Sequence, residues 1–230
     1  MKKVLFVLFV AIFLGGCAGG IIKTNRSDQT KSIEIRAITQ HGFEYTNLVG
    51  MAFFGILGAG LNDKVEKEST ESIGELLTKA VSQGSLLRSF ESSAKPTLQR
   101  LYPNATITLE IADTSNQHKN FNEWFSKDSG AAVSNKVPGL LIIEVGYRLE
   151  AVRKVQGLEA NGWLGIKIVD ASSGRVIGRA LDSSLATMSG VGILKSGQEL
   201  NREEFFRESN RAFQELVGKL ANRAMAKVAD

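Results

Sequence analysis

Cysteine and histidine are scarce in this sequence, and their scarcity excludes several kinds of site. The 230 residues include one cysteine, Cys17, and two histidines, His41 and His118. A single cysteine allows no internal disulfide and no thiolate-rich metal site, so the core alone must hold the fold together. The two histidines show neither i,i+4 nor HxH spacing, which disfavours a metal site even with Glu44 or Asp113 as further ligands. Neither histidine lies in a recognisable motif with a nucleophile and an orienting acid, so we predict no catalytic histidine.

Phosphate-binding and nucleic-acid-binding patterns are also missing. The glycines at 190, 192 and 197 form neither a GxxxxGK(S/T) loop nor a GxGxxG turn between a strand and a helix. The sequence has 28 lysines and arginines against 24 acidic residues, and the basic residues form no dense cluster that would favour nucleic acid. We therefore expect no cofactor, no nucleic-acid partner and no enzymatic activity.

The first sixteen residues have the pattern of a secretory signal. Lys2 and Lys3 give a short positive start, and Val4 to Leu14 is an unbroken apolar run. The run is too short to span a bilayer, for which about 20 apolar residues are needed. Removal of residues 1–16 on export would take away two of the 28 basic residues, so the mature chain is less basic than the full sequence.

This signal ends in Leu14-Gly15-Gly16-Cys17, which resembles the lipobox of bacterial lipoproteins. The resemblance implies cleavage before Cys17, a diacylglyceryl thioether on its sulfur, and an acyl chain such as palmitate on its new amino group. Stable anchoring takes about two chains, so three would fix the protein to the membrane permanently. Ala18, in place of Asp, resembles the enterobacterial signal for export to the outer membrane, where the protein would face the periplasm.

Beyond the signal we expect a tether and one folded domain. Residues 17–32, from the lipidated cysteine onward, are mostly small and polar, which is typical of a flexible linker. Residues 33–230 then form a single α/β domain. In it, Ile33 to Thr39 and Thr106 to Ile111 alternate in polarity and predict strands.

A glycine-rich apolar segment, residues 48–61, stands out within the domain. Its sequence, LVGMAFFGILGAGL, has no charge and four glycines, which weaken both helix and strand. It is too short for a spanning helix. A loop or short helix against the core, a hairpin dipping into the membrane, and a self-association surface all stay open. If the segment touches a membrane or a partner, we expect the contact from Phe53, Phe54, Ile56 and Leu57.

The middle of the chain predicts helices and an aromatic cluster. A capping box followed by an apolar stripe predicts a helix that Gly84 ends or bends, and Pro96 marks the start of a second helix. Phe121, Trp124 and Phe125 interrupt a polar stretch. Aromatic residues at this spacing are more often core than surface, so we predict that they pin a short helix or loop to the body.

The C-terminal half predicts a three-strand antiparallel meander. Apolar residues alternate over residues 141–151, which indicates a long, half-buried strand. A turn over residues 157–162 leads to a second strand at 163–170. A tight turn at 170–174 then leads to a third strand at 176–187.

One face of the first meander strand carries charge. Glu144, Arg148 and Glu150 follow one another at intervals of two or four residues, so they share a face. Acid/base chemistry by the two carboxyl groups would need a cleft and a raised pKa, and the sequence indicates neither. We interpret the three residues as the solvated face of the meander.

A closing helix completes the predicted fold, which is a two-layer α/β (α+β) sandwich of amphipathic helices on a mixed sheet. Asn201 and Glu204 cap this helix, and its apolar stripe would face the sheet. The stretches PGLLIIEVGYRLEAV, IKIVDASSGRVIGRA and FFRESNRAFQELVGKL resemble, in their pattern, the periplasmic domains of the curli-secretion lipoprotein and the penicillin-binding-protein activator lipoproteins. This resemblance covers roughly residues 105–225 and implies an α/β periplasmic domain.

Three hypotheses for the function follow from these features. The first is a non-enzymatic envelope lipoprotein whose periplasmic domain binds and scaffolds or regulates an envelope protein complex. The alternative is a self-assembling lipoprotein that inserts residues 48–61 into the membrane as part of a secretion or pore assembly, in which case it forms a homo-oligomer. The third is an envelope hydrolase, for which Glu144, His41 and His118 are the candidate residues.

Overall fold

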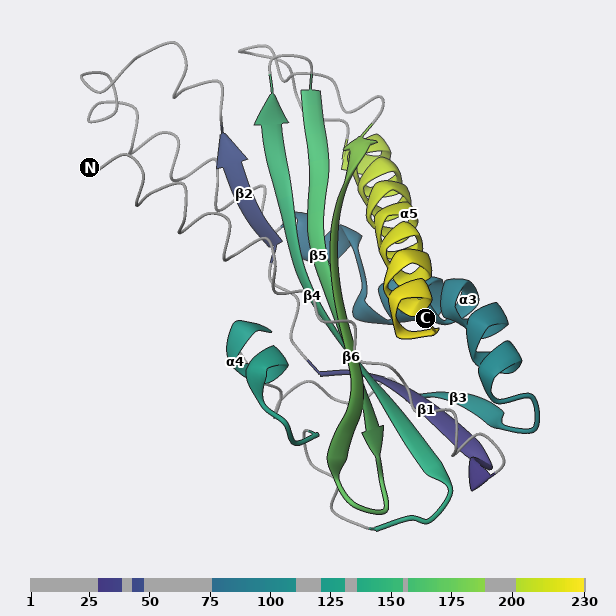
Figure 1. Ribbon diagram of the computed structural model, residues 1–230. Helices are drawn as coiled ribbons and strands as arrows, with labels where there is room; N and C mark the ends of the chain where they lie inside the picture. Colours follow the sequence, from purple (N-terminus) through teal and green to yellow (C-terminus); the bar gives the residue numbers. More distant parts are fainter. Residues whose placement is uncertain are drawn as a thin grey trace, which may run out of the picture.

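A mixed β-sheet forms the centre of the structure (Figure 1). The computed structural model describes residues 29–38, 43–47, 76–110, 121–130, 136–154, 157–188 and 202–229. The strands are β1 (Ser32–Ala37), β2 (Phe43–Asn47), β3 (Thr106–Glu110), β4 (Leu140–Lys154), β5 (Gly157–Asp170) and β6 (Arg175–Met188). The helices are α3 (Gln83–Leu101), α4 (Phe121–Ser126) and α5 (Arg202–Ala229), and residues 76–80 are also helical.

The strand order is β3-β1-β4-β5-β6, and β2 pairs with β4 as well. β1 is parallel to both β3 and β4, and β2 is parallel to β4. Parallel neighbours need a crossover connection, and α3 lies in the connection between β1 and β3. β4, β5 and β6 form an antiparallel meander. The predicted mixed sheet, meander and C-terminal helix are therefore confirmed.

The two faces of the sheet are covered differently. α3 and α5 cover one face, called the front face below, and α4 lies against the other, the back face (Figure 1). The front face holds the main core, because every second residue of β4 and β5 points into it. Its largest contributors from these two strands are fully or almost fully buried: Leu141, Ile143, Val145, Tyr147, Leu149, Leu164, Ile166 and Ile168.

The closing helix α5 meets this core with the predicted apolar stripe. Phe205, Phe213, Leu216, Val217 and Leu220 are buried, as expected. Each such side chain contributes roughly 1.5–3 kcal/mol through the apolar area removed from water. The helix contacts β5, β6 and α3, so it ties the meander to the first half of the domain.

Helix α3 runs without a break past Gly84 and Pro96, where the sequence predicts helix boundaries. The side chain of Ser82 caps it by accepting a hydrogen bond from the Ser85 backbone N–H at 3.1 Å, so the break between helices precedes Gly84. Pro96 lies inside this helix and starts no new one, which makes the predicted second helix start wrong. The ring of Pro96 is on the exposed side, and the core contacts on the opposite side hold the helix across it.

The first turn of the meander is also displaced from its predicted place. Strands β4 and β5 pair continuously up to Lys154 and Gly157, so residues 157–162 belong to β5 and the predicted turn there is wrong. Gly162 serves close packing: a Cβ there would lie 2.9 Å from Leu149 and 3.0 Å from Leu216.

The predicted turn from Asp170 to Gly174 is confirmed. A carboxylate oxygen of Asp170 accepts hydrogen bonds from the Ser172 backbone N–H at 3.1 Å and from its hydroxyl at 2.7 Å. Gly174 closes the turn at a φ of 70°, a conformation that suits glycine.

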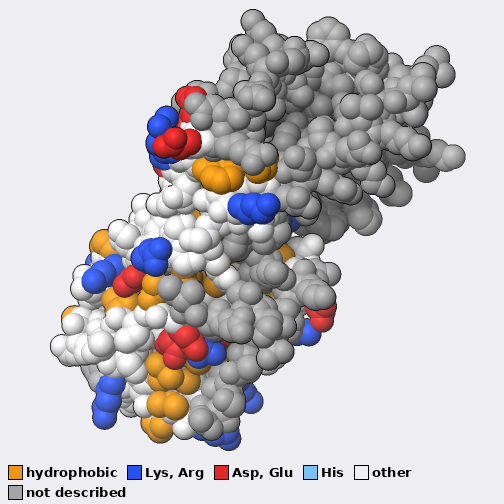
Figure 2. Space-filling model, turned by 180° about the vertical axis from the view of Figure 1, so that it is seen from behind, with side chains coloured by type: hydrophobic (Ala, Val, Ile, Leu, Met, Phe, Trp, Pro, Cys, Tyr) orange, Lys and Arg blue, Asp and Glu red, His pale blue; other side chains and the backbone are white. Residues whose placement is uncertain are grey.

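The described surface mixes charges of both signs. Seen from behind, Lys and Arg side chains are scattered among acidic and polar ones, and apolar side chains surface in several separate patches (Figure 2). Among the described helices, none combines the length and the apolar character that crossing a bilayer requires.

Candidate functional site

A row of charged side chains crosses the back face of the sheet at one level. The strand register places Glu110 of β3 beside Arg36 of β1, and Arg36 beside Glu144 of β4. Glu144 is opposite Lys167 of β5, which is opposite Arg179 of β6. Residues that are direct neighbours on one face of a sheet interact across the strands. The row therefore links five strands through side chains that alternate in sign over its first four positions.

The centre of the row is buried, although charged groups are normally exposed. Glu144 and Lys167 each have 0% of their surface exposed. Taking two charges out of water costs several kcal/mol per ion unless they are paired and hydrogen-bonded. Glu144 is directly opposite Lys167 in the register and acts on it electrostatically, and the segment around α4 supplies hydrogen bonds.

Trp124 of α4 covers Glu144 on the back face of the sheet. Its indole Nε1 donates a hydrogen bond to Glu144 Oε2 at 3.0 Å, and the side chain is 1% exposed. The ring also lies 5.7 Å from Phe121 and 5.9 Å from Phe125, centre to centre. The prediction that this aromatic cluster pins a short helix to the body is therefore confirmed.

Two facing glycines make room for the indole. Gly146 of β4 and Gly165 of β5 are direct partners in the register. A Cβ at Gly146 would lie 2.4 Å from Trp124 Cζ3, and one at Gly165 would lie 3.0 Å from both Phe121 and Phe125. Only residues without a side chain allow α4 to approach the sheet this closely.

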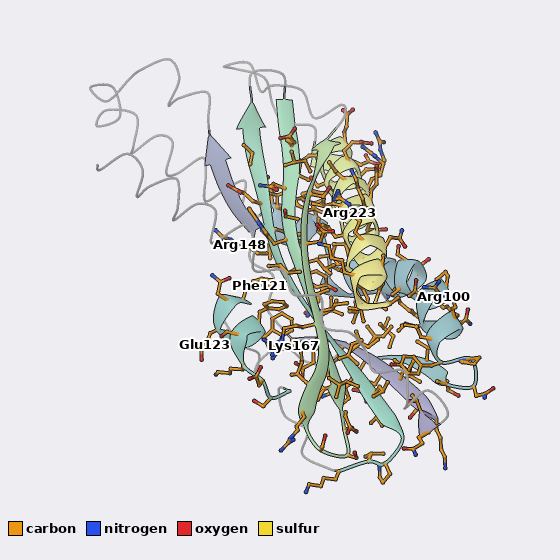
Figure 3. The ribbon with its side chains drawn as sticks, viewed as in Figure 1. Arg100, Phe121, Glu123, Arg148, Lys167 and Arg223 are labelled. Atoms are coloured by element: carbon orange, nitrogen blue, oxygen red, sulfur yellow. The ribbon has the colours of Figure 1, made fainter. Side chains whose placement is uncertain are left out.

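Lys167 is held from the same side (Figure 3). Its Nζ donates hydrogen bonds to the backbone carbonyls of Lys127 at 3.0 Å and Ser129 at 3.1 Å, just after α4. The ammonium also lies 5.2 Å from the centre of the Trp124 ring, within reach of a cation–π interaction. Burial lowers the pKa of Lys167, and the nearby charge of Glu144 opposes that shift.

The two ends of the row are closed by further ion pairs. Arg179 pairs with Asp128, donates to the Phe125 carbonyl at 3.4 Å, and lies over the Phe125 ring. At the other end, Arg36 pairs with Glu34, and with Glu110 at 3.3 Å. Burial raises the pKa of Glu34; a hydrogen bond with Glu110 adds to the increase, and Arg36 opposes it.

The charged-face prediction is thus correct in part. Arg148 is exposed and stacks on Trp163, 5.2 Å from the ring centre, and Glu150 is half-buried. Glu144 is buried, so its predicted place on a solvated face is wrong. The reason is that α4 covers this level of the sheet. The facing Gly146 and Gly165 are the only local signal of that cover.

Sequence and structure comparisons give no family for this chain. No family model and no curated protein matches the sequence. The chain is similar to PelC from Paraburkholderia phytofirmans, a dodecamer, at 10% identity over 92% of this chain and 94% of that one, with a TM-score of 0.33. It is similar to the hypothetical protein CT253 from Chlamydia trachomatis at 8% identity over 87% and 99%, with a TM-score of 0.37.

A third similar structure is protein XCC0632 from Xanthomonas campestris, at 10% identity over 86% of both chains and a TM-score of 0.34. At these identities and TM-scores the likenesses carry no argument about function. The interpretation of the site therefore rests on the residues of this chain.

Several residues named from the sequence lie outside the described residues. They are the lipobox Leu14, Gly15, Gly16 and Cys17, the segment residues Phe53, Phe54, Ile56 and Leu57, and the histidines His41 and His118. The tether, apart from its last residues, lies outside as well. Within the described residues, no three His, Cys, Asp or Glu side chains come together as metal ligands.

The buried cluster can hold α4 in place, but it is not arranged for acid/base chemistry. A general base needs access to a substrate proton. Glu144 is fully covered and accepts from Trp124, while Lys167 donates to two backbone carbonyls. The arrangement therefore makes α4 a specifically docked element of the back face.

Proposed function

We propose that this protein is a lipid-anchored lipoprotein of the bacterial envelope, most simply of the outer membrane facing the periplasm. Its α/β domain would bind and scaffold or regulate an envelope protein complex without catalysing a reaction. The observation that carries the proposal is the sequence Leu14-Gly15-Gly16-Cys17, directly after a positive start and an apolar run.

The position of the first strand supports a tethered domain. β1 begins at Ser32, which is 15 positions after Cys17, and such a segment reaches roughly 50 Å when extended. That reach allows the domain to meet partners well above the lipid surface. The tether thus suits a binding role in the periplasm.

The burial of Glu144 supports a non-enzymatic role. Glu144 is the one hydrolase candidate whose side chain the structure describes, and it is committed to holding Trp124. A carboxylate used in this way stabilises a binding module. It offers no acid or base to a substrate.

The anchor is tested by labelling the full chain with palmitate in a bacterial host. We expect the wild type and a Gly16→Ala variant, which keeps a small residue before the cut, to incorporate label and sediment with membranes. We expect Cys17→Ser to incorporate none. Label in Cys17→Ser, or none in the wild type, would refute the anchor.

A second form of the chain, residues 18–230 exported behind a cleavable signal without a lipobox, separates the proposal from the insertion alternative. If this form stays with membranes through alkaline carbonate, residues 48–61 would be favoured as a membrane-inserting segment. The binding role is tested by crosslinking in intact cells. A defined protein neighbour that is lost with Cys17→Ser supports the role, and only random neighbours would contradict it.

A further inference from the structure

The outer edge of β6 is covered by side chains instead of by a strand. β6 is the last strand of the sheet, and among the described strands none pairs with its outer side. Lys227 of α5 donates to the Leu181 carbonyl at 2.9 Å, and Arg223 donates to the Ser183 carbonyl at 3.3 Å. The Ser183 backbone N–H donates to Asp182 Oδ1 at 2.8 Å. The backbone groups of Leu181 and Ser183 therefore point outward, as an added strand would require.

These covering contacts are held together by one carboxylate. Asp182 lies 3.5 Å from Lys227 Nζ and 4.0 Å from Arg223 Nε. The side chains of Arg223 and Lys227 are nearly half exposed, so their contacts are screened by solvent and easily exchanged. A second strand can replace the two cations at the carbonyls while Asp182 keeps them nearby.

The sequence of this edge reads almost identically in both directions. Residues 180–186 are Ala-Leu-Asp-Ser-Ser-Leu-Ala, which is symmetric about Ser183 except for Asp182 and Ser184. In an antiparallel pair about a two-fold axis, residue i of one copy meets residue j of the other and j meets i, so a symmetric sequence places identical residues opposite each other. The symmetric stretch coincides with the covered part of the edge.

We propose that two copies of this chain associate through β6, paired antiparallel about Ser183 to form one continuous sheet. The register would place Leu181 opposite Leu185 of the second copy on the back face, and Ala180 opposite Ala186 on the front. Asp182 would face Ser184, so no like charges meet within the strand pair.

Exposure at the edge fits this occupant. Leu185 is 51% exposed, which makes it one of two large apolar side chains strongly exposed in the described structure. Pairing about Ser183 covers Leu185 with Leu181 twice, once on each side of the axis. The proposal goes beyond the function proposed above and does not depend on the lipid anchor.

Arg223 and Lys227 make the association conditional. Two pairs of these cations would approach one another at the axis, with only two Asp182 carboxylates between them. Their repulsion is screened by salt, so we expect the dimer to strengthen as ionic strength rises. Arg223 and Lys227 thus oppose pairing of β6 with its own copy, along an edge whose sequence is otherwise nearly symmetric.

The register is tested with Ser183→Cys in the full chain under mild oxidation. The pairing puts Ser183 beside its own copy as a hydrogen-bonded pair, whose Cα atoms are about 5.5 Å apart, within the range of a disulfide. Ser92→Cys, an exposed position on α3, serves as the matched control, and the unmodified chain accounts for Cys17. A reducible dimer from Ser183→Cys alone supports the proposal. No dimer, or equal dimer from Ser92→Cys, overturns it.

The energetics are tested by sedimentation of the full chain in detergent. Leu185→Lys should raise the dimer Kd roughly tenfold or more, because it removes two apolar pairs. Arg223→Gln with Lys227→Gln should lower it by a similar factor. Val137→Lys replaces another exposed apolar residue outside β6 and should leave it unchanged. Unchanged unfolding midpoints establish that the variants fold, and a Kd that ignores Leu185→Lys overturns the proposal.

Discussion

Gly146 and Gly165 leave a space beneath Trp124, called the glycine slot below. This slot makes the docking of α4 sensitive to a single methyl group. In Gly146→Ala the new Cβ would lie 2.4 Å from Trp124 Cζ3 and 2.9 Å from Cε3. The indole is rigid and 1% exposed, so it cannot relieve this contact by a small rotation. We expect Trp124 to leave its site and α4 to detach from the back face.

The cost has two parts that can be sized separately. Overpacking of a filled site costs about 1–3 kcal/mol. Loss of the Trp124 hydrogen bond leaves the buried carboxylate of Glu144 with one donor fewer, which costs about 1–3 kcal/mol more. Relaxation of α4 relieves part of the first cost, so we expect the free energy of unfolding to fall by about 2–4 kcal/mol.

Tryptophan fluorescence and urea unfolding measure this effect. The sequence has two tryptophans, so a Trp163→Phe background leaves Trp124 as the sole emitter. Emission should shift to the red in Gly146→Ala as the ring enters water. In a Trp124→Leu background the same change should cost under about 1 kcal/mol, since the smaller side chain leaves room. If the losses in unfolding free energy from Gly146→Ala and Trp124→Leu simply add, the steric conflict between the new methyl group and Trp124 is refuted.

Two predictions concern pH. The lowered pKa of Lys167 means that the unfolded chain binds more protons between that pKa and about 10.5, so stability should rise with pH in this window, and Lys167→Met should flatten the rise. Urea unfolding at several pH values checks this, and an equally steep rise in the variant would contradict it. Burial raises the pKa of Tyr147 well above its usual value near 10, so the folded chain holds its proton longer and stability should fall above about pH 10. Tyr147→Phe should weaken this alkaline loss, as measured by thermal unfolding at pH 9 to 11, and an undiminished loss would exclude Tyr147 as its source.

The parts of the fold that the sequence predicts are those with a local period. The alternation in β4 and the apolar stripe of α5 are properties of neighbouring residues, and the structure confirms both. The turn at Asp170 is equally local, because its side chain closes the turn on itself. In these segments propensity, pattern and burial agree.

The parts that the sequence does not predict depend on distant partners. β2, which is not predicted as a strand, exists by pairing with β4, more than a hundred residues later. Pro96 reads as a helix start, yet the buried face of α3, with Phe90 and Leu98, carries the helix across it. Burial of Glu144 depends on α4, and the only sign of this cover in the strand sequences is the glycine pair Gly146 and Gly165.

The buried charges explain how the register of the central strands is chosen. A slip of β5 by two residues keeps every apolar side chain on its face, so hydrophobicity alone does not forbid it. Such a slip would move Glu144 from Lys167 to Gly165 or Val169, leaving a carboxylate and an ammonium buried apart. Separating a buried pair costs about 3–5 kcal/mol, which is more than the pair contributes when intact. The same slip would separate Gly146 from Gly165 and close the slot for Trp124. The charge row and the glycine slot therefore select the same register, and α4 docks only where both are formed.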